Sequence, residues 1–467
     1  MTTLRYCKGC FAKQQKINAL EEENARLKAQ VRRQERTAKE GFFGASTPSS
    51  KVPVKAKALP DRQARRGGGR PGHSGHGRNA LREDQADRVE RVAAPDRCPH
   101  CRVRLVARGL RRRTVVDIEP VKAYTTVFLL ERKRCPKCGR PFEGRPPGIL
   151  PKGLYGNRLL AYVAAQHYLH GNTLGQIERQ TGVGCGALVQ ALRHTADLFE
   201  GVMSRLVEEY RKAPVKHADE TGWRTDGQNG YAWIFATREL SLFRFRKSRS
   251  AAVAAEVFGL KHLPGTLVVD RYHGYNKIRC NIEYCYSHLK RDVEGIQQDF
   301  PDNPEIAAFV ESLVPAISQA MSLRTLALPR RQFLNQAATI KRRIMAIAHR
   351  QAKHPAIWRI QNIFRENAHR LYHWARDPTI PAENNLAERD LRPLVIARKI
   401  SFGSQSEAGA HTREILMSIL HTLKKRGRSP AAALQDALDQ LARHPDLDPC
   451  PIFFLSQRPA PQRPLRN

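Results

Sequence analysis

The sequence predicts a multidomain α/β protein with a strongly basic surface. Its 467 residues include 80 Lys and Arg against 44 Asp and Glu, which gives a formal net charge of +36. That length corresponds to two to four domains of about 100–200 residues each. With 41% apolar residues, the chain can bury a core and is not disordered as a whole. In its middle part the apolar pattern changes from the helical period of 3.6 residues to the alternation typical of strands.

The positive charge predicts a polyanionic partner. A sequence pI near 10.3 implies strong self-repulsion, and counterion release on phosphate neutralisation makes DNA or RNA the natural ligand. A ribosome-associated or simply solvated basic surface is the alternative. No apolar run approaches the ~18–20 residues of a membrane helix, and the N-terminus lacks the apolar core of a signal peptide. We therefore expect a soluble intracellular protein with no membrane partner.

Residues 1–40 begin with the pair Cys7 and Cys10 and continue as a predicted helix. One Asn and several apolar residues recur at alternating steps of three and four, as in the a/d seam of a short coiled coil. Asn24 occupies an a position, where a polar residue can set the register. Because the seam spans only about two heptads, dimerisation and a lone amphipathic helix both stay open. The seam residues are Ile17, Leu20, Asn24, Leu27 and Val31.

Residues 41–96 are predicted to form a basic linker rich in Gly and Pro. The stretch 65–78 reads Arg-Arg-Gly-Gly-Gly-Arg-Pro-Gly-His-Ser-Gly-His-Gly-Arg and has no apolar residue to bury other than its proline. Such a segment is typical of flexible linkers that contact phosphates. A nucleotide-binding glycine loop would need a strand before it and a helix after it, and neither is predicted here.

Residues 97–150 contain two Cys-x-x-Cys pairs, which predict a zinc-binding module. Cys98 and Cys101 form the first pair, and Cys135 and Cys138 the second. Four thiolates suit one tetrahedral Zn²⁺, and the strand-like alternation between the pairs predicts a hairpin that brings them together. A redox pair would need a thioredoxin-like βαβ context, which is absent. The N-terminal Cys7 pair has no second pair nearby and stays unassigned.

Residues 151–212 are predicted to be helical and to resemble a helix-turn-helix. Thr173 can cap one helix, and a glycine-rich turn at 181–186 leads into the next. A short glycine turn between two helices is the pattern of DNA-binding helix pairs. An ordinary corner between two helices fits the pattern equally well. The basic charge of the chain favours DNA contact.

Residues 213–288 are predicted to form the first part of an α/β core. Three strands come first, a helix at about 250–260 follows, and a further strand ends the series. Three antiparallel strands, a helix, a strand and later helices follow the order of a ribonuclease-H-like fold. The predicted strands are 215–219, 231–237, 241–245 and 266–270.

The rest of the chain is predicted to be mainly helical. A helical insertion at 289–380 interrupts the core, and 381–427 supplies its final helix region. A C-terminal helix and a loose tail rich in Pro and Arg follow at 428–467.

Two predicted strands end in carboxylates, Asp219 and Asp270. Adjacent strand ends would place these groups close together, where hard oxygen ligands suit a pair of Mg²⁺ or Mn²⁺ ions. Two such ions can activate a water or a 3′-hydroxyl and stabilise the leaving oxygen of a phosphoryl transfer. Each Asp alone is also an ordinary strand-ending residue.

A third carboxylate is expected from a helix beside these strands. Glu388 shares one helical face with Arg392 at i, i+4, so a metal-binding carboxylate would lie next to a phosphate-binding cation. Glu383 competes for this role, and a surface ion pair is the alternative. Position alone does not separate the two glutamates.

Several motifs then follow one another in an order that is highly specific. They are the Gly-Arg-Pro-Gly-His-Ser-Gly-His linker, the paired Cys-x-x-Cys module, the helical segment, Asp219-Glu-Thr-Gly-Trp, Asp270-Arg-Tyr-His-Gly-Tyr, Asn384-Asn-x-x-Glu388-Arg-x-x-Arg392-Pro, Arg398-Lys399 and Phe402-Gly-Ser404. In these motifs the chain resembles the DDE transposases of bacterial insertion sequences, in particular the insertion sequence sixty-six family, over residues 15–425.

The resemblance implies an enzyme with an acidic triad of Asp219, Asp270 and Glu388, which favours Glu388 over Glu383. In such an enzyme the triad holds two Mg²⁺ (or Mn²⁺) ions, cuts DNA at transposon ends and joins the freed 3′-hydroxyls to target DNA. The zinc module, with structural Zn²⁺, and the helical domain would bind the terminal inverted repeats. Two DNA ends imply a homodimer or a higher oligomer, and accessory proteins of the same element are further implied partners.

Charge and placement further suggest that Arg392, Arg398 and Lys399 bind DNA phosphates near the scissile bond. Cys285 and His288 match a Cys-x-x-His segment of the family, and packing, DNA contact and metal binding all stay open for them. We expect a bacterial cytoplasmic, nucleoid-associated protein. The alternatives are a catalytically silent DNA-binding regulator derived from a transposase, and a nuclease that cuts without joining.

Overall fold

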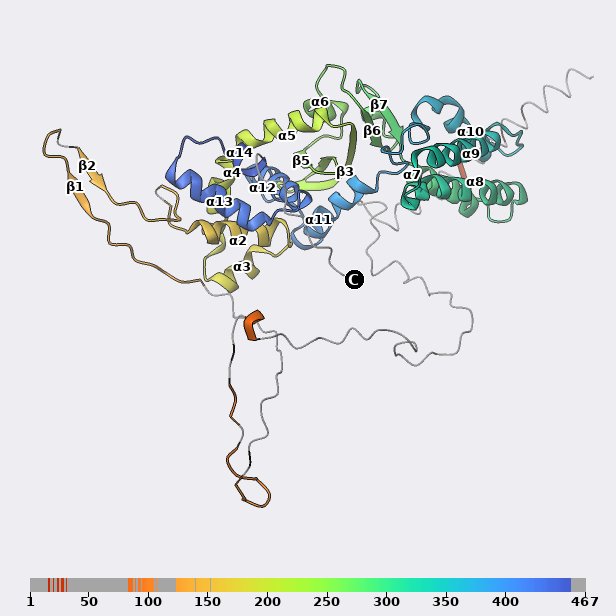
Figure 1. The fold of residues 1–467 in the computed structure, drawn as a ribbon. Helices are drawn as coiled ribbons and strands as arrows, with labels where there is room; N and C mark the ends of the chain where they lie inside the picture. The colour runs from red at the N-terminus through yellow and green to blue at the C-terminus, as the bar shows by residue number, and fades with distance from the viewer. Residues whose placement is uncertain are drawn as a thin grey trace, which may run out of the picture. The chain divides into compact units, whose positions relative to one another are not determined.

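The computed structural model describes residues 123–454 except 139 and 152, and a smaller set of positions before them. The chain divides into two units, one comprising 48–122 and the other 1–47 with 123–467. Figure 1 shows the fold of the described residues. The earlier described positions are 16, 20, 23, 24, 27, 28, 31, 83–86, 89, 91–93, 95–104 and 106.

Described positions of the expected coiled-coil seam are helical. Leu20, Leu27 and Val31 are each about half exposed, so an apolar edge of this helix is open to solvent. In the unit 48–122 the structure describes a short 3₁₀ turn, η1 (Glu83–Gln85), and the turn that contains the first cysteine pair. The linker stretch 65–78 lies outside the described residues.

A small two-stranded ribbon carries the second cysteine pair. It pairs β1 (Arg132–Arg134) with β2 (Pro141–Glu143) in antiparallel fashion. The strand that alternation predicted at 124–130 is wrong, because this stretch has no regular structure. Val127 and Leu129 are more than 80% exposed and none of the apolar side chains in this stretch is buried, so no core fixes them in a pleat.

The helical segment contains α2 (Asn157–Tyr168), α3 (Leu174–Thr181), α4 (Cys185–Asp197) and α5 (Glu200–Lys212). Thr173 caps α3 as expected: its side chain accepts from the backbone of Gln176, whose own side chain accepts from the backbone of Thr173. Gly182 ends α3 with a φ of 71°, a left-handed conformation that glycine adopts without strain. The helices and the tight turn therefore lie where the sequence predicted them.

The core is a five-stranded mixed sheet in the order β5-β4-β3-β6-β7. β3 pairs antiparallel with β4 and β4 with β5, whereas β6 runs parallel to both β3 and β7. The mixed α/β class is thus confirmed. The strands are β3 (Val215–Thr225), β4 (Gln228–Ala236), β5 (Ser241–Arg246), β6 (Thr266–Val269) and β7 (Asn281–Tyr284).

Two features of the sheet differ from the sequence prediction. β3 does not end at Asp219 but continues to Thr225, because it forms a long hairpin with β4 that turns at Asp226 and Gly227. β7 was not predicted, since it is short and three of its four residues are buried without alternation. One of these is the buried Glu283, which accepts hydrogen bonds from the backbone of 373 and 374.

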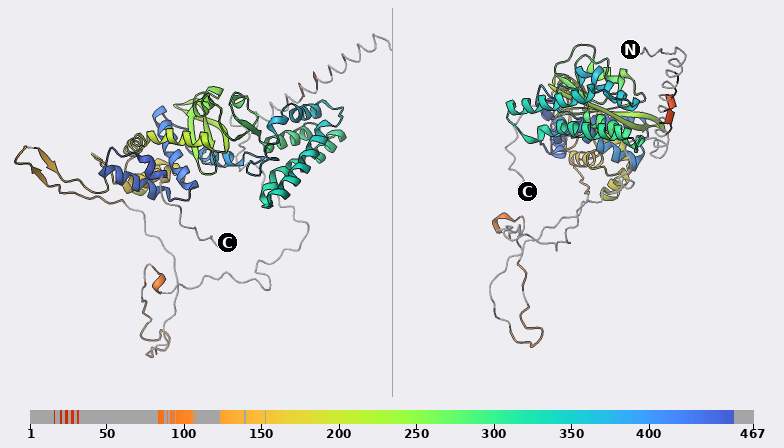
Figure 2. Two further views of the ribbon diagram at one scale, coloured as in Figure 1. Left: turned by 45° about the horizontal axis from the view of Figure 1, so that its top comes forward. Right: turned by 90° about the vertical axis from the view of Figure 1, so that its right-hand side faces the viewer.

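Helices cover both faces of the sheet (Figures 1 and 2). On one face the rings of Tyr210 from α5, Phe235 from β4 and Phe258 from α6 (Ala251–Phe258) pack edge to face. On the other face α11 (Asn385–Ser401) packs on β3 and β4, and α12 (Glu407–Lys425) packs on β5. Between α11 and α12 the helical path breaks at Phe402, which has a φ of 60°.

α12 also completes the hydrogen bonding of β5, the outer strand. Every fourth residue of α12 accepts a hydrogen bond from every second backbone N–H of β5. Two residues of a strand and four residues of a helix both advance by about 6–7 Å, so the two rows match. The pairs are Ser241 with Thr422 Oγ1 (3.1 Å), Phe243 with Ser418 Oγ (2.9 Å) and Phe245 with Glu414 Oε2 (3.1 Å).

Between β7 and α11 lies a group of helices that the sequence predicted. Its 3₁₀ turns are η3 (Leu323–Leu326) and η4 (Ala368–Arg370), and a further turn, η2 (His273–Tyr275), precedes β7. The helices are α7 (Tyr286–Asp299), α8 (Pro304–Ser322), α9 (Arg330–His349) and α10 (Pro355–Glu366).

One described segment, Pro304–Leu326, is long and apolar enough to cross a membrane by these two criteria alone. This differs from our expectation that no apolar run would qualify. The segment packs between α7 and α9, and seven residues of α8 are buried there. Core helices of soluble proteins pass the same test, so the segment is weak support for a membrane span.

The last helices return to the helical segment that precedes the sheet. α13 (Pro430–Arg443) packs on α2, and α14 (Pro449–Phe454) packs on α5. Asn157 at the start of α2 donates to Asp439 of α13 at 2.8 Å. The tail after 454, predicted to be loose, lies outside the described residues.

Candidate active site

Two neighbouring parallel strands bring Asp219 and Asp270 to the same end of the sheet. β3 and β6 pair over Val215–His217 and Thr266–Val268. Asp219 follows two residues beyond this pairing, and Asp270 directly follows β6. The expectation that both strands end at these residues is therefore right for Asp270 and wrong for Asp219, yet both groups lie where the parallel pairing stops.

The register of the sheet decides which face Asp219 occupies. Asp219 lies opposite Ile234 of β4, which lies opposite Phe243 of β5, and side chains in such a cross-strand row share one face. The ring of Phe243 contacts His421 of α12. Asp219 therefore projects toward the face that α11 and α12 cover.

Asn384 holds the start of α11 against β3, next to Asp219. This buried side chain donates from Nδ2 to the carbonyl of Ala218 (2.8 Å) and bonds from Oδ1 to Nδ1 of His217 (2.9 Å). The backbone N–H of Glu388 donates to the carbonyl of Asn384 at 3.2 Å, as in the first turn of a helix. The asparagine thereby places Glu388 one turn from the point where α11 is attached to the sheet.

The three predicted carboxylates lie close enough for their charges to interact. Burial raises the pKa of Asp219 well above its ordinary value, and the negative charges of Glu220, Asp270 and Glu388 add to the shift. The arrangement is unfavourable when all groups are ionised and no cation is near. Carboxylate oxygens are the ligands that Mg²⁺ and Mn²⁺ prefer, so a cation near these three groups would relieve the repulsion.

The other candidate glutamate faces different neighbours. Burial raises the pKa of Glu383, whereas the positive charges of Arg324 and Arg389 lower it. Glu383 is not among the charges that shift Asp219. The charges that act on Asp219 therefore favour Glu388, rather than Glu383, as the third carboxylate.

Sequence reasoning missed Glu220, a fourth acidic residue near the site. It pairs with Trp233 of β4 and so lies on the opposite face from Asp219. Its buried carboxylate accepts from the hydroxyl of Tyr275 (2.6 Å) and from Nη2 of Arg249 (2.6 Å). The sequence signal for Glu220 was a second acidic residue directly after Asp219 at the end of a predicted strand.

The three predicted DNA-binding residues of α11 have two different environments. Arg392 and Lys399 are exposed. Arg398 is buried and donates to Thr221 Oγ1 (3.0 Å) and to the carbonyl of Gly222 (2.5 Å) in β3. Arg398 shares the inward helical face with Leu391 and Leu394 and attaches α11 to the sheet, so its hydrogen bonds to β3 do not support the predicted contact with DNA phosphates.

Cys285 and His288 lie beside Glu388. One ligand atom from each of these three residues lies within 4.8 Å of the other two. Burial raises the pKa of the Cys285 thiol to about 11, and its sulfur accepts from the backbone N–H of Asn384 at 3.1 Å. Burial also lowers the pKa of His288. The Cys-x-x-His segment thus belongs to the carboxylate site.

Each expected zinc knuckle is a turn around its first cysteine. Backbone hydrogen bonds from the residues two and three positions later lower the pKa of Cys98 and of Cys135. Cys98 and Cys101 belong to the unit 48–122, whereas Cys135 and Cys138 belong to the other unit. Zinc binding by these four residues stays a prediction.

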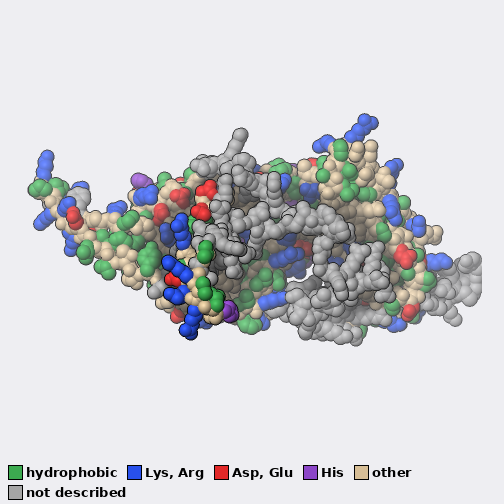
Figure 3. Space-filling view, turned by 60° about the horizontal axis from the view of Figure 1, so that its bottom comes forward, with side chains coloured by type: hydrophobic (Ala, Val, Ile, Leu, Met, Phe, Trp, Pro, Cys, Tyr) green, Lys and Arg blue, Asp and Glu red, His purple; other side chains and the backbone are tan. Residues whose placement is uncertain are grey.

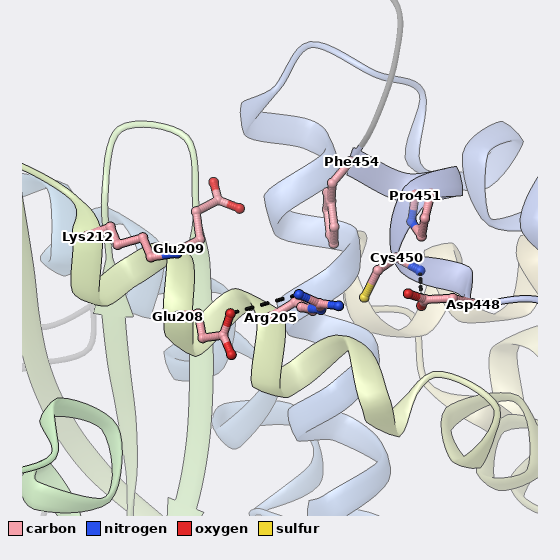
Figure 4. Close-up of a pocket in the computed structure, with 8 residues that line it drawn as sticks. All are labelled: Arg205, Glu208, Glu209, Lys212, Asp448, Cys450, Pro451 and Phe454. Carbon is pink, nitrogen blue, oxygen red and sulfur yellow. Dashed lines mark hydrogen bonds and ion pairs between the residues drawn. The ribbon is translucent and has the colours of Figure 1, made fainter.

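A separate cavity of about 330 Å³ lies between α5 and α14 (Figure 4). Charged residues such as Arg205 and Glu208 line it together with Cys450 and Phe454. None of the predicted site residues contributes to its wall. Figure 3 shows separate groups of Lys and Arg side chains on one face of the molecule, with Asp and Glu side chains near some of them.

Comparison with known proteins identifies the class. A family model described as "Transposase IS66 family" matches residues 152–412. Since the match covers more than half of the chain, the protein belongs to the IS66 family of transposases. The family suggests DNA as its partner.

Two relatives come from Sinorhizobium fredii, and both are described as uncharacterized proteins. The protein y4qI is 23% identical over 421 residues, which covers 76% of this chain and 73% of the relative. The protein y4jD is 25% identical over 219 residues, which covers 42% of this chain and 41% of that relative. Neither description adds an activity.

Proposed function

We propose that the protein is a metal-dependent DNA transposase that cuts DNA at the ends of its element and joins the freed 3′-hydroxyls to target DNA. The observation that carries the proposal is the convergence of Asp219, Asp270 and Glu388 from β3, β6 and α11. The strand order β5-β4-β3-β6-β7, in which β4 alone runs antiparallel to the other four strands of this sheet, supports a ribonuclease-H-like core.

The three carboxylates have the donor chemistry for two divalent cations. When bound, two Mg²⁺ or Mn²⁺ ions supply an activated oxygen nucleophile and stabilise the leaving oxygen of an in-line phosphoryl transfer. Asp219 lies in β3 and Asp270 directly follows β6, and Asn384 attaches the start of the helix that carries Glu388 to β3. A site built on strands and a helix keeps this geometry better than one on loops.

Several basic surfaces support DNA as the substrate. Arg392 and Lys399 lie on the exposed side of α11, at helical steps from Glu388 that keep the three residues near one face. In the helix pair α3 and α4, Arg179 and Arg193 are exposed, as expected of helices that contact a DNA backbone. We propose that α11 contacts phosphates near the scissile bond and that the helix pair binds the element's ends.

Cleavage and strand transfer on DNA that carries the element's own ends test the proposal. Wild-type protein with Mg²⁺ should give cleaved and joined products, whereas Asp270→Asn should give neither and still bind the DNA. Asp302→Asn, the same chemical change at an exposed position, serves as the matched control and should behave like wild type.

The same assay separates the alternatives. Specific binding to the ends without cleavage by either protein contradicts the proposal and indicates a DNA-binding regulator. Cleavage without joined products indicates a nuclease. Further predictions are zinc binding by the four cysteines, homodimerisation and accessory partners. The zinc content of the purified protein tests the first of these predictions. Sedimentation of the protein on end DNA tests its oligomeric state.

A further inference from the structure

The starts of two helices and the end of one strand meet at Cys285. The backbone N–H of Cys285 donates to the carbonyl of Val269, the residue before Asp270, at 2.8 Å. Its sulfur accepts from the backbone of Asn384, the residue before α11. Because Cys285 is also the N-cap of α7, it joins the three elements that surround the carboxylates.

This junction places His288 at the carboxylate site. His288 is the third residue of α7, and Glu388 is the fourth residue of α11. In the described part of the chain, His288 Nδ1 and Glu388 Oε1 are both buried without a hydrogen-bond partner. Buried polar atoms are almost always satisfied in folded proteins, so two orphaned atoms on neighbouring side chains point to a missing ligand.

A cationic group already lies against the same two side chains. Nη2 of Arg291 is 3.2 Å from Nε2 of His288 and 3.6 Å from Oε1 of Glu388. The side chain of Arg291 is half exposed, so it can move away without disturbing the core. In this tautomer Nε2 accepts from Arg291 and Nδ1 carries the proton, so a metal ion that displaces Arg291 would meet the Nε2 lone pair beside the carboxylate of Glu388.

We propose that His288 is a nitrogen ligand of the cation that Glu388 binds. This inference rests on the proposed function, because it concerns one of the two metal positions of that site. Cys285 is a positioning residue and not a ligand, since its sulfur accepts backbone hydrogen bonds and hard divalent ions disfavour thiolates. A mixed nitrogen and oxygen ligand set favours Mn²⁺ over Mg²⁺, because imidazole suits transition metals better than magnesium.

Mn²⁺ bound to the full chain gives a direct test. Electron spin-echo spectroscopy detects the ¹⁴N of a directly coordinated imidazole, and the protein must carry no polyhistidine tag. Wild-type protein should show this nitrogen modulation, and His288→Ala should lose it and bind Mn²⁺ at least about tenfold more weakly. His349→Ala, which removes an exposed histidine of α9, should retain both properties.

Each outcome has a defined meaning. Nitrogen modulation that persists in His288→Ala, or that is absent from wild-type protein with bound Mn²⁺, overturns the ligand assignment and leaves the proposed transposase intact. If wild type binds no Mn²⁺ and gives no strand transfer, the proposed function falls with it. His288→Gln, with its melting temperature compared with that of wild type, shows whether a lost signal reflects a lost ligand or a misfolded site.

Discussion

At the scale of single residues, the hydrogen bonds of Asn384 connect the elements that carry the carboxylates. Its amide joins the backbone of β3 to the imidazole of His217, and its backbone N–H reaches Cys285. This one side chain and its peptide fix three parts of the chain relative to one another, namely β3, the start of α7 and the start of α11. The sequence motif that contains Asn384 therefore has a structural role beside the catalytic role that we propose for Glu388.

Replacing Asn384 should be costly. Asn384→Ala leaves the carbonyl of Ala218 and Nδ1 of His217 without their partner, and each buried orphan costs about 1–3 kcal/mol of unfolding free energy. Urea denaturation measures the loss. Asn385→Ala, at the exposed neighbour, is the control and should change stability by less than about 0.5 kcal/mol. Equal effects of the two variants would contradict the positioning role.

His421 should make stability depend on pH. Burial lowers its pKa to about 4 in the folded protein, whereas an unfolded histidine titrates near 6.5. Between these two pH values the unfolded state binds more protons than the folded state. The contribution of His421 to the free energy of unfolding is therefore fully present above pH 6.5 and is lost as the pH falls toward 4. The shift corresponds to about 3 kcal/mol at most.

The variant His421→Gln isolates this contribution. Glutamine can still donate to the carbonyl of Tyr168, which His421 contacts at 3.2 Å, but it does not titrate. When the pH is lowered from 7 to 4.5, the free energy of unfolding should therefore decrease less for the variant than for the wild-type protein. Parallel pH curves for the two proteins would show that His421 carries no such linkage.

At the scale of elements, α12 provides the hydrogen bonds that an outer strand would otherwise lack. Unpaired strand edges promote edge-to-edge association, and the side chains of Glu414, Ser418 and Thr422 block this edge of β5 from within the molecule. Glu414 also forms a buried ion pair with Arg244 and a second pair with Arg246. The helix thus takes the place of a neighbouring strand beside β5.

Removing one hydroxyl from this row should destabilise the fold. Ser418→Ala leaves the backbone N–H of Phe243 unpaired in the core, at a cost of about 1–3 kcal/mol. Ser312→Ala in α8 is the matched control, because Ser312 bonds only to its own helix. Chemical denaturation of both variants checks the expectation, which fails if the two changes cost the same.

The elements also show what the sequence could and could not predict. Periodicity located β4, β5, β6 and the helices, because burial of one face imposes a repeat on the chain. It missed β7, since a strand buried on both faces shows no alternation. It placed Asp219 and Asp270 at the same end of the sheet, as the structure does. It did not predict that Arg398 points inward, because only the packing of α11 decides which face of this helix is buried.

At the scale of the whole molecule, the clustered carboxylates reduce stability when no cation is bound. A ligand that binds only the native state adds a stabilisation that grows with its concentration, about 2.7 kcal/mol at one hundred times its Kd. Mg²⁺ or Mn²⁺ should therefore raise the Tm of the wild-type protein. Asp270→Asn should show a smaller rise, and Asp302→Asn the full rise. An unchanged Tm in wild type would contradict metal binding.

The packing of α13 on α2 has a consequence for the timing of maturation. The helix pair that we propose to bind DNA lies beside α2, whose buried side is closed by α13, a helix made more than 200 residues later by the ribosome. A growing chain therefore exposes the apolar side of α2 until α13 has emerged. The protein can engage the ends of its element in a fully packed form only after synthesis has passed α13, so incomplete chains lack a finished DNA-binding surface.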